Sequence, residues 1–381
     1  MNRKKGSIPK MRVTFILKGS LEALPPLLPR LIAFAKRGIT TAIICSSMTE
    51  NNQAKLSEFG VRCYHTKHST KIFGKEKRLA DWANFRANVK TLLDTELRSS
   101  ELLYICSADA ALCLGGLLKR KAFILQCNEL YDTLPMYKHG LKRYMQNAAA
   151  VVVPELCRAN LFAYWYSLEQ LPLVIPNIPL TESLQRRQKI NDPCAEKIME
   201  EIGEKKILIY QGHITSGERS LNVVAEALNA INDPSFVLLL MGREHDNTVS
   251  ALQNIYDKTY YIPFIPAPEH LQVTSHAYIG LLSYSRVSMN NMFCAPNKLY
   301  EYSSFGIPML GNDIPGLKYS IEGNSMGCCA DYNDLQAVIS GIRMIDENHS
   351  VYANNALAFY NSADLEGLMD ELLKRVLGGS E

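Results

Sequence analysis

The chain has 381 residues, 47% of them apolar and 21% charged, which excludes disordered and collagen-like classes and fits two domains of ordinary size. Its net charge of +3 conceals an asymmetry: residues 1–180 hold 26 Lys and Arg against 13 Asp and Glu, whereas residues 181–381 hold 15 against 25. The N-terminal half would therefore be the one to approach an anionic surface, such as phospholipid headgroups or a pyrophosphate, although a solvated lysine-rich face explains the charge equally well. No nucleic-acid-binding motif accompanies this charge, so nucleic acid is not an expected partner.

Short apolar runs in the first half are expected to be strands, with amphipathic helices between them. Such continuous apolar strands, separated by helices, are typical of a parallel sheet covered on both faces. The expected strands are Arg12–Leu17, Thr41–Cys45, Val61–His65, Leu102–Cys106, Ala122–Cys127, Ala149–Val153 and Val174–Ile175.

The second half repeats this alternation of strands and helices. Strands are expected at Lys206–Tyr210, Phe236–Met241, Tyr260–Ile262, Tyr278–Leu282 and Pro308–Gly311, and helices at Leu221–Ile231, Pro296–Phe305, Asn333–Met344 and Ala363–Leu377. A proline-containing junction and a change of charge sign near residues 176–195 separate the two halves. We therefore predict an α/β protein with two Rossmann-like, doubly wound domains, in which ligands bind beyond the carboxyl ends of the strands, in a cleft.

Cysteine usage and hydropathy bear on the compartment. The ten cysteines form no CxxC pair and show no metal-ligand spacing, which favours a reducing compartment and predicts no metal site. No secretory apolar region follows the basic residues 1–10, and no apolar run approaches the about 18 residues that a membrane span needs. A cytoplasmic location is expected, with any membrane contact peripheral and at the inner face.

The segment Asn290–Asp313 carries the strongest chemical signal. Pro296 suits the first position of a helix, and Gly306 suits its end. This helix follows a buried strand, so its N-terminus, with unpaired N–H groups and the positive end of the dipole, should face the cleft and suit a phosphate.

Polar residues of this helix are candidates for binding. Asn297 and Lys298 lie in the first turn, where a lysine is mildly unfavourable unless an anion binds there. Glu301, one turn further, could accept hydrogen bonds from two vicinal hydroxyls, as on ribose. An ordinary capped amphipathic helix is the alternative. We prefer that alternative for the apolar positions and a functional role for Lys298 and Glu301.

The residues Pro296–Tyr302, with Gly306–Pro308, resemble the donor-site signature of family 4 glycosyltransferases, retaining enzymes of the two-domain GT-B fold. Other segments resemble the same family along nearly the whole chain: Asn128–Thr133, Val151–Glu155, Ile175–Asn177, Tyr210–Ile214 with Arg219, and Leu239–Gly242. The resemblance implies an acceptor domain at residues 1–178 and a nucleotide-sugar domain at 179–360. It also implies that a helix within residues 361–381 packs back on the first domain.

The resemblance implies roles for residues of the second domain. Gly212 would let the backbone approach the donor diphosphate, Arg219 would neutralise that diphosphate as it leaves, and Gly242 belongs to the next strand-and-glycine turn. His213 stands where the family commonly has arginine. Lys298 and the helix start at Pro296 and Asn297 would hold the same developing charge.

The paired-glutamate motif of the family is only half present. Glu301 matches its second glutamate, which is assigned to the ribose, but the first glutamate would fall at Phe293. Asn291 is a candidate substitute. Recognition of the transferred sugar would therefore differ from that of the family.

The first domain offers fewer candidates. Gly19 follows the first expected strand, and Asn128 falls where relatives often carry a histidine near the reacting carbon. Asp109 and Glu129 are polar candidates for the cleft, and for each a structural and a functional role are equally expected.

The resemblance implies transfer of a sugar from a nucleotide-sugar donor to a glycan or lipid-linked glycan, with retention, in polysaccharide or cell-surface glycan synthesis. No metal cofactor is expected, because protein cations would hold the diphosphate and no Asp-x-Asp loop is present. Basic stretches around Lys67–Arg78, Lys119–Lys121 and Lys142–Tyr144 suggest contact with an anionic membrane.

Other functions remain open at this point. A nucleotide-sugar epimerase would have the same fold, but no convincing set of acids for handling a sugar C–H proton can be placed. A non-catalytic nucleotide-sugar-binding protein fits the substitutions at His213, Phe293 and Asn128. A nicotinamide dehydrogenase is disfavoured, because GxGxxG is missing after the strand that ends at Leu17.

Overall fold

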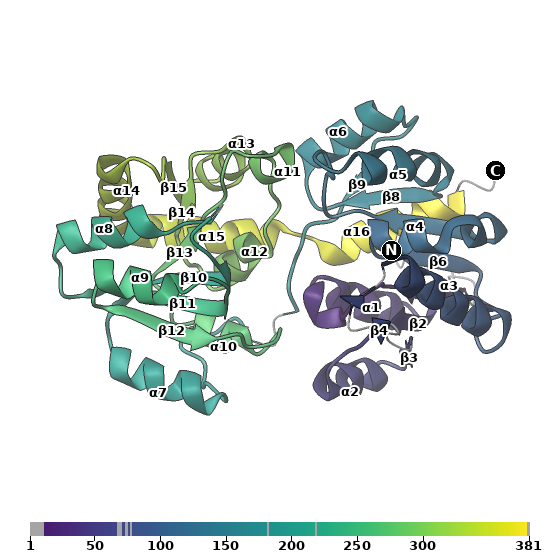
Figure 1. Cartoon of the computed structure of the whole chain (residues 1–381), viewed down its shortest axis with the longest axis horizontal. Helices are drawn as coiled ribbons and strands as arrows, with labels where there is room; N and C mark the ends of the chain where they lie inside the picture. The colour runs from purple at the N-terminus through teal and green to yellow at the C-terminus, as the bar shows by residue number, and fades with distance from the viewer. Residues whose placement is uncertain are drawn as a thin grey trace, which may run out of the picture. The chain divides into compact units, whose positions relative to one another are not determined.

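The computed structural model describes residues 11–66, 71–72, 75–76, 78–180, 183–217 and 219–378. The chain divides into two compact α/β units (Figure 1). The N-terminal unit comprises Met1–Pro176 together with Asp364–Glu381, and the C-terminal unit comprises Asn177–Ala363. The first boundary therefore lies between residues 176 and 177, whereas the sequence analysis expected it between 178 and 179. The second lies between residues 363 and 364, whereas it was expected between 360 and 361.

A parallel sheet of seven strands forms the centre of the N-terminal unit, as predicted. Its strand order is β3-β2-β1-β6-β7-β8-β9, so the order changes direction between β1 and β6. The strands are β1 (Arg12–Ile16), β2 (Thr40–Cys45), β3 (Arg62–His65), β6 (Leu102–Ile105), β7 (Ala122–Gln126), β8 (Ala150–Val153) and β9 (Leu173–Val174).

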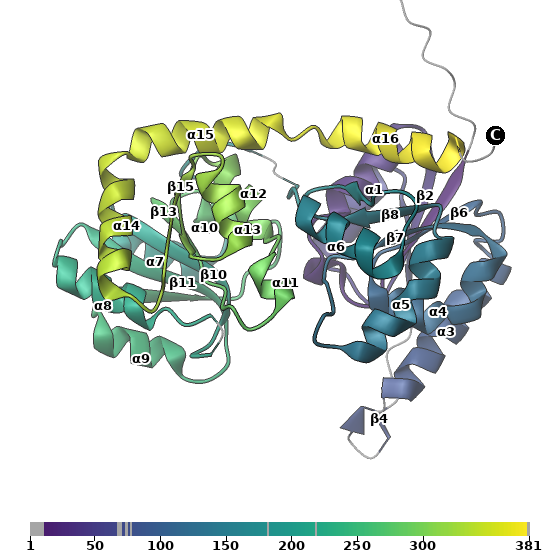
Figure 2. The same cartoon turned by 90° about the horizontal axis from the view of Figure 1, so that it is seen from above.

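Helices cover this sheet on both faces. Figure 2 shows α16 on one side of the sheet and α3 to α5 on the other. The helices of the unit are α1 (Leu27–Lys36), α2 (Glu50–Glu58), α3 (Arg78–Asp94), α4 (Ala108–Leu114), α5 (Pro135–Asn147), α6 (Leu156–Tyr166) and α16 (Leu365–Leu377). A separate antiparallel pair, β4 (Lys71–Ile72) with β5 (Lys75–Glu76), lies in the predicted basic stretch, of which residues 67–70, 73–74 and 77 fall outside the described residues.

Aromatic rings join the two strands at the change of direction. The Phe15 ring of β1 stacks on the Tyr104 ring of β6 with centroids 4.4 Å apart, and Phe34 of α1 meets Phe15 edge-on at 5.2 Å. The last helix packs on this unit through Arg37, whose Nε donates to Asp370 at 2.7 Å and whose Nη1 lies 2.5 Å from Glu366. The C-terminal helix is therefore part of the N-terminal unit.

The C-terminal unit is built on a second parallel sheet, of six strands. Its order is β12-β11-β10-β13-β14-β15, with the change of direction between β10 and β13. The strands are β10 (Lys206–Ile214), β11 (Phe236–Glu244), β12 (Thr259–Pro263), β13 (Ile279–Leu282), β14 (Met309–Asn312) and β15 (Gly327–Ala330). Both β10 and β11 extend past their predicted ends, and β15 was not predicted.

Alternate residues of β10 enter two different cores, which explains why residues 207–210 are all apolar or aromatic. Ile207 and Ile209 face one cluster, and Leu208 and Tyr210 face the other. The first cluster also receives α7 (Pro193–Ile202), α10 (His270–Thr274), α12 (Asn297–Ser304) and α15 (His349–Ser362). The second receives α8 (Asn222–Ile231), α9 (Thr248–Ile255) and α14 (Leu335–Glu347). Short helices α11 (Met289–Met292) and α13 (Pro315–Leu317) complete the unit.

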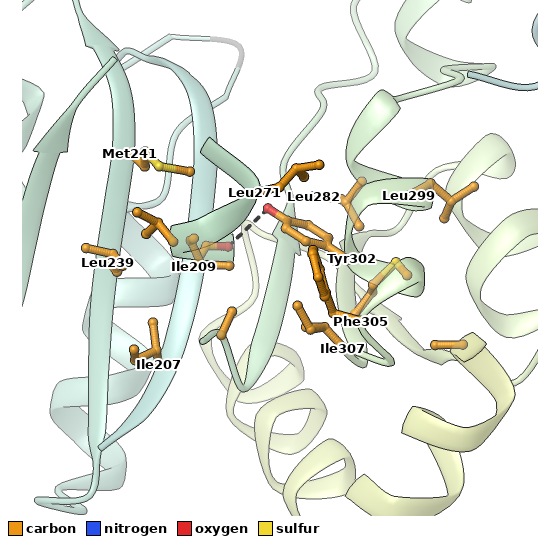
Figure 3. Packing of buried hydrophobic residues seen from close by; sticks show 14 of the residues in the cluster. Ile207, Ile209, Leu239, Met241, Leu271, Leu282, Leu299, Tyr302, Phe305 and Ile307 are labelled. Atoms are coloured by element: carbon orange, nitrogen blue, oxygen red, sulfur yellow. Dashed lines mark hydrogen bonds between the residues drawn. The ribbon is translucent and has the colours of Figure 1, made fainter. Parts of the chain in front are cut away.

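Helix α12 is held on the sheet by Tyr302. The ring is fully buried among apolar residues of β10, β11 and α10, and its hydroxyl donates to the Ile209 carbonyl at 3.3 Å (Figure 3). The ring lies against the backbone of Gly280 in β13, where a Cβ would sit 2.3 Å from Tyr302 Cδ2. This packing fixes the helix that carries Lys298 and Glu301.

Replacing Gly280 with alanine is expected to lower the free energy of unfolding by about 1–3 kcal/mol, because the added methyl group would overlap the Tyr302 ring. Gly217→Ala is the matched control, since its Cβ would meet only Thr215 Oγ1, at 3.8 Å. Equilibrium urea unfolding of the parent and both variants measures the difference. Equal midpoints for Gly280→Ala and the parent would contradict this packing.

Candidate functional site

The candidate site lies on the C-terminal unit, at the carboxyl ends of β10 and β13. These two neighbouring strands flank the change of direction in strand order, where open α/β sheets bind ligands. Gly212 and His213 lie at the end of β10, Tyr284 follows β13, and Lys298 lies in the first turn of α12. The structure therefore brings residues from separate parts of the sequence to one edge of the sheet.

Lys298 is at the centre of this group. Its Nζ lies 4.3 Å from the centroid of the Tyr210 ring and 5.4 Å from that of Tyr284. The guanidinium carbon of Arg219 lies 5.0 Å from the same Tyr284 centroid. A Cβ placed on Gly212 would be 3.8 Å from Lys298 Nζ. Lys298, Arg219 and Gly212, which the sequence assigned to one diphosphate, are thus close together.

The ammonium group of Lys298 is buried, and the opposite charge nearest to it in effect is that of Glu301, which offsets only part of the lowering of its pKa. The residue is only 7% exposed, and its Nζ has no hydrogen-bond partner among the described residues. Burial, followed by the charge of Arg219, lowers the pKa of Lys298 to about 7. The rings of Tyr210 and Tyr284 give some cation–π stabilisation, but a buried cation beside a second cation is unfavourable unless an anion joins them.

Two glycines shape the backbone beside this cation. Gly212 has φ +136° and Gly242 has φ +148°, which favour glycine. They are paired across β10 and β11, and a Cβ on Gly242 would lie 1.8 Å from the Gly212 carbonyl oxygen. Gly242 therefore allows the close approach of the two strands, while Gly212 leaves space open in front of Lys298.

Glu301 is held by neighbouring polar groups. It is 4% exposed, its Oε2 accepts a hydrogen bond from Gln211 Nε2, and its Oε1 lies 3.4 Å from His270 Nε2. Thr274 in turn donates to Gln211 Oε1 at 2.8 Å. The sequence analysis did not assign roles to Gln211, His270 and Thr274. Gln211 could have been noticed, because it is a buried polar residue that directly follows the apolar residues 207–210 of the same strand.

The start of α12 matches the sequence prediction to within one residue. The helix begins at Asn297, and Pro296 is its N-cap residue, in extended backbone and without a side-chain cap. The Ala295 carbonyl just before it accepts a hydrogen bond from Asn177 Nδ2 at 3.0 Å. Asn291 lies in a different short helix, α11, where its Nδ2 donates to Ser285 Oγ at 3.3 Å.

His213 has a partner that the sequence did not predict. Its Nδ1 lies 2.8 Å from Nε2 of His245, the residue after β11, and the ring centroids are 5.1 Å apart. Burial, followed by the charges of Arg219 and other neighbours, lowers the pKa of His213. The free site thus favours a neutral imidazole at this position.

In the N-terminal unit, the predicted residues follow the adjacent strands β1, β6 and β7. Gly19 comes after β1 with φ +147°, and its carbonyl accepts from the Ser46 N–H at 2.9 Å. Asn128 follows β7, and its Oδ1 accepts from Gln126 Nε2 at 3.0 Å. These residues therefore lie along one edge of the first sheet.

The two acidic candidates of this unit have structural partners. Asp109, in the first turn of α4, accepts a hydrogen bond from the Tyr137 hydroxyl. Glu129 lies 3.4 Å from Nη1 of the buried Arg158. Tyr131 stacks on Tyr137 at 4.9 Å. The partners of Asp109 and Glu129 hold these carboxylates in place, and their catalytic roles remain predictions.

Two features are absent from the described residues. None of the helices in these parts of the chain combines the length and hydropathy of a membrane span. In the same residues, no three His, Cys, Asp or Glu side chains are grouped so that they could hold a metal ion.

Solved structures share this fold at low sequence identity. HepE of Anabaena, solved with UDP-glucose, is 14% identical, with 97% of this chain and 100% of that chain covered and a TM-score of 0.71. Sucrose-phosphate synthase of Thermosynechococcus elongatus is 14% identical, with 97% and 100% covered and a TM-score of 0.69. The N-terminal domain of Candida albicans trehalose-6-phosphate phosphatase is 11% identical, with 100% and 99% covered and a TM-score of 0.68.

No protein-family model matches the sequence, and no curated protein sequence matches it. The solved structures therefore establish the fold, two Rossmann-like domains of the GT-B type, as the sequence predicted.

The free energy of unfolding should depend on pH through Lys298. Its pKa is about 7 in the folded chain, against 10.5 for an ordinary lysine, so the unfolded chain binds the extra proton between these values. Stability should therefore rise with pH above 7, by at most about 1.4 kcal/mol per pH unit. Lys298→Met removes this dependence, so the stability of the parent relative to this variant should increase between pH 7 and 9.

Urea unfolding at each pH measures this difference. Lys197→Met, at an exposed lysine of α7, is the control, and its difference from the parent should stay constant across the range. A constant difference for Lys298→Met as well would show that the lysine is not buried as a strained cation.

Proposed function

We propose that this chain is a glycosyltransferase that takes a sugar from a nucleotide-sugar donor, with the donor diphosphate bound at Gly212, Arg219 and Lys298. One observation carries the proposal: the Lys298 ammonium is buried, has no hydrogen-bond partner among the described residues and lies beside a second cation and a backbone without a side chain. A diphosphate would supply the missing negative charge. The first N–H groups of α12, which Pro296 does not cap, would add donors to the same anion.

The chemistry requires that negative charge be stabilised as the sugar leaves. When the bond between the anomeric carbon and the diphosphate oxygen breaks, the charge on that oxygen grows. Arg219 and Lys298 are already in position, so no reorganisation is needed when the charge develops. Each well-placed donor of this kind is worth about 3–4 kcal/mol of transition-state stabilisation. Because these cations would perform this task, we propose that transfer needs no divalent metal.

Glu301 fits binding of the nucleoside. A carboxylate only accepts hydrogen bonds, and each of its oxygens has two lone pairs. With Gln211 and His270 as protein partners, Glu301 still has acceptor positions for the two hydroxyls of a ribose. The surrounding hydrogen bonds would keep the carboxylate in one orientation, which lowers the cost of binding.

The comparisons and the sequence motifs support the donor class. HepE, with the same fold, was solved with UDP-glucose. The motif around Pro296–Tyr302 resembles that of family 4 enzymes, from which we propose retention at the anomeric carbon. On the same basis the acceptor would be a glycan or lipid-linked glycan, and Asp109 and Glu129 of the N-terminal unit would serve on the acceptor side.

A non-catalytic nucleotide-sugar-binding protein is the second candidate. It is favoured by Phe293 and Asn128, which stand where the family carries a glutamate and often a histidine. Both candidates require donor binding, and only the first requires turnover.

A screen of UDP, GDP, ADP and dTDP, with their sugars, tests the proposal. The matching nucleotide, at 100 times its dissociation constant, should stabilise the chain by about 2.7 kcal/mol in a thermal unfolding assay. Transfer or hydrolysis of the matching sugar should continue in EDTA. Binding without turnover, across a panel of acceptors, would favour the non-catalytic candidate, and the absence of binding by all four nucleotides would refute the proposed site.

Arg219→Ala is expected to lower kcat by about 10²–10³-fold with a smaller change in donor affinity, because charge builds on the diphosphate mainly in the transition state. Glu301→Ala should mainly weaken donor binding. Arg187→Ala is the control, since this exposed arginine pairs with Glu204 in the same unit. Steady-state kinetics measure all three. Parent-like rates for both site variants would contradict the assignment.

We also propose that the N-terminal unit binds an anionic membrane surface, at the inner face of a cytoplasmic membrane, through α5 and α6. Lys142 and Arg143 are exposed on α5, and apolar side chains are exposed nearby in sequence at Leu134 and Met136. Tyr164, on the neighbouring helix α6, is 83% exposed. Cationic and apolar side chains together are typical of peripheral membrane binding.

Flotation with vesicles tests this surface. The parent should float with vesicles that contain phosphatidylglycerol and not with pure phosphatidylcholine, and Lys142→Glu with Arg143→Glu should reduce flotation several-fold. Lys189→Glu with Lys197→Glu makes the same change of charge at exposed positions of the C-terminal unit and should float like the parent. If the parent floats with neither kind of vesicle, the proposed membrane-binding surface is refuted.

A further inference from the structure

The pair His213 and His245 combines features that an isolated surface histidine lacks. The two residues come from adjacent strands: His213 lies in the last part of β10, and His245 directly follows β11. His213 Nδ1 and His245 Nε2 are 2.8 Å apart, which is a hydrogen-bond distance, and the rings are inclined by only 27°. Both residues are accessible to solvent at the strand ends, although neighbouring atoms partly cover His213.

Cations dominate the surroundings of this pair. Arg243 is in β11, Lys298 is in α12, and Arg219 lies in the loop between β10 and α8. Each of them lowers the pKa of His213, after burial and together with His245. Lys298 and Arg219 also belong to the proposed diphosphate site, so the same cations act on the pair and on that site. Tyr210 contacts the His213 carbonyl through its hydroxyl, at 3.0 Å.

The nearby carboxylates have other hydrogen-bond partners. Glu244 Oε1 accepts from the Val249 N–H at 2.8 Å. Asp246 Oδ2 accepts from both the backbone N–H and the hydroxyl of Ser216, at 2.9 and 2.6 Å. These acids are engaged in loop and helix-end contacts, and the charges that shift the pKa of His213 are those of the cations and of His245.

The hydrogen bond between the rings limits how protons can be arranged. In a neutral pair, one inner nitrogen carries the shared N–H and the other accepts it. Each ring then has one outer nitrogen, and only one of the two outer nitrogens carries a proton. A single added proton gives both outer nitrogens an N–H group, so the pair becomes a donor of two hydrogen bonds with a net charge of +1.

We propose that the His213–His245 pair takes up one proton from solvent when a nucleoside diphosphate binds, and that the protonated pair becomes part of the diphosphate site. This inference rests on the proposed function and extends it to His245, a residue that no sequence motif indicated. Before binding, the neighbouring cations oppose a further positive charge. The diphosphate neutralises these cations and adds negative charge, so uptake of one proton by the pair becomes favourable.

The pair would then replace the arginine that the family commonly has at the His213 position. An arginine is charged at all relevant pH values, whereas this pair would be charged only with an anion present. In this proposal the pKa of the pair is higher in the complex than in the free chain. The affinity for the nucleoside diphosphate should therefore increase as the pH falls below the pKa of the pair in the complex. It should stop increasing below the pKa of the pair in the free chain, because the pair is then charged in both states.

Calorimetric titration with UDP, or with whichever of GDP, ADP and dTDP binds, measures the linked protons. Titrations at pH 7.0 in two buffers of different ionisation enthalpy give the number of protons taken up for each ligand bound. We expect the parent to take up at least half a proton more than His245→Gln or His213→Gln. Protons that the ligand gains or loses itself cancel in this comparison.

Lys298 needs its own control, because its pKa of about 7 makes it a second candidate for the added proton. Lys298→Arg keeps the positive charge but cannot exchange a proton at pH 7.0. In this background His245→Gln should still reduce the uptake. Equal uptake with and without His245 would assign the proton to another group and overturn the inference.

Histidine NMR covers the case in which a glutamine variant fails to bind. The ring signals of His213 and His245 are identified by their loss in the two variants, and in the parent they should move toward imidazolium positions when the nucleotide is added at pH 7.0. Nucleotide binding without that movement would overturn the inference and leave the proposed function intact. Absence of nucleotide binding by the parent would instead refute the proposed function.

Discussion

The ammonium of Lys298 is the feature on which the rest of the site depends. It lies near the rings of Tyr210 and Tyr284 and near Arg219, and no described residue offers it a hydrogen bond. A fold does not gain stability from a buried cation next to another cation. Burying the ammonium near Arg219 therefore lowers the stability of the free chain, and a bound anion would reduce this cost. Beside the ammonium are Gly212, which has no side chain, and the start of α12, which has no side-chain cap.

The position of this cation follows from packing below it. Tyr302 and Gly280 fit together, and Tyr302 reaches the carbonyl of Ile209, so α12 is tied to β13 and β10 at once. Lys298 and Glu301 lie on the same short helix and are positioned by the same contacts. Lys298 and Glu301 are therefore held on a packed helix, which is what the proposed stabilisation of a departing diphosphate requires of them.

Much of this architecture could be predicted from the sequence, because strands buried on both faces are continuous apolar runs and the helix starts and ends carry local signals. Strand β15 was missed since Gly327-Cys328-Cys329-Ala330 has neither β-branched nor aromatic residues, and only its pairing with β14 makes it a strand. Gly212, Arg219 and Lys298 were predicted from their motifs. Gln211, His270 and His245 were not, because their contacts join residues that are 31 to 90 positions apart in the chain, which only the fold brings together.

A structure of the chain with a bound nucleoside diphosphate tests the central claim most directly. The account predicts diphosphate oxygens within hydrogen-bond distance of Lys298 Nζ, with the guanidinium of Arg219 alongside and the ribose hydroxyls at Glu301. A nucleotide bound elsewhere, with the Lys298 ammonium still unpartnered in the complex, would contradict it.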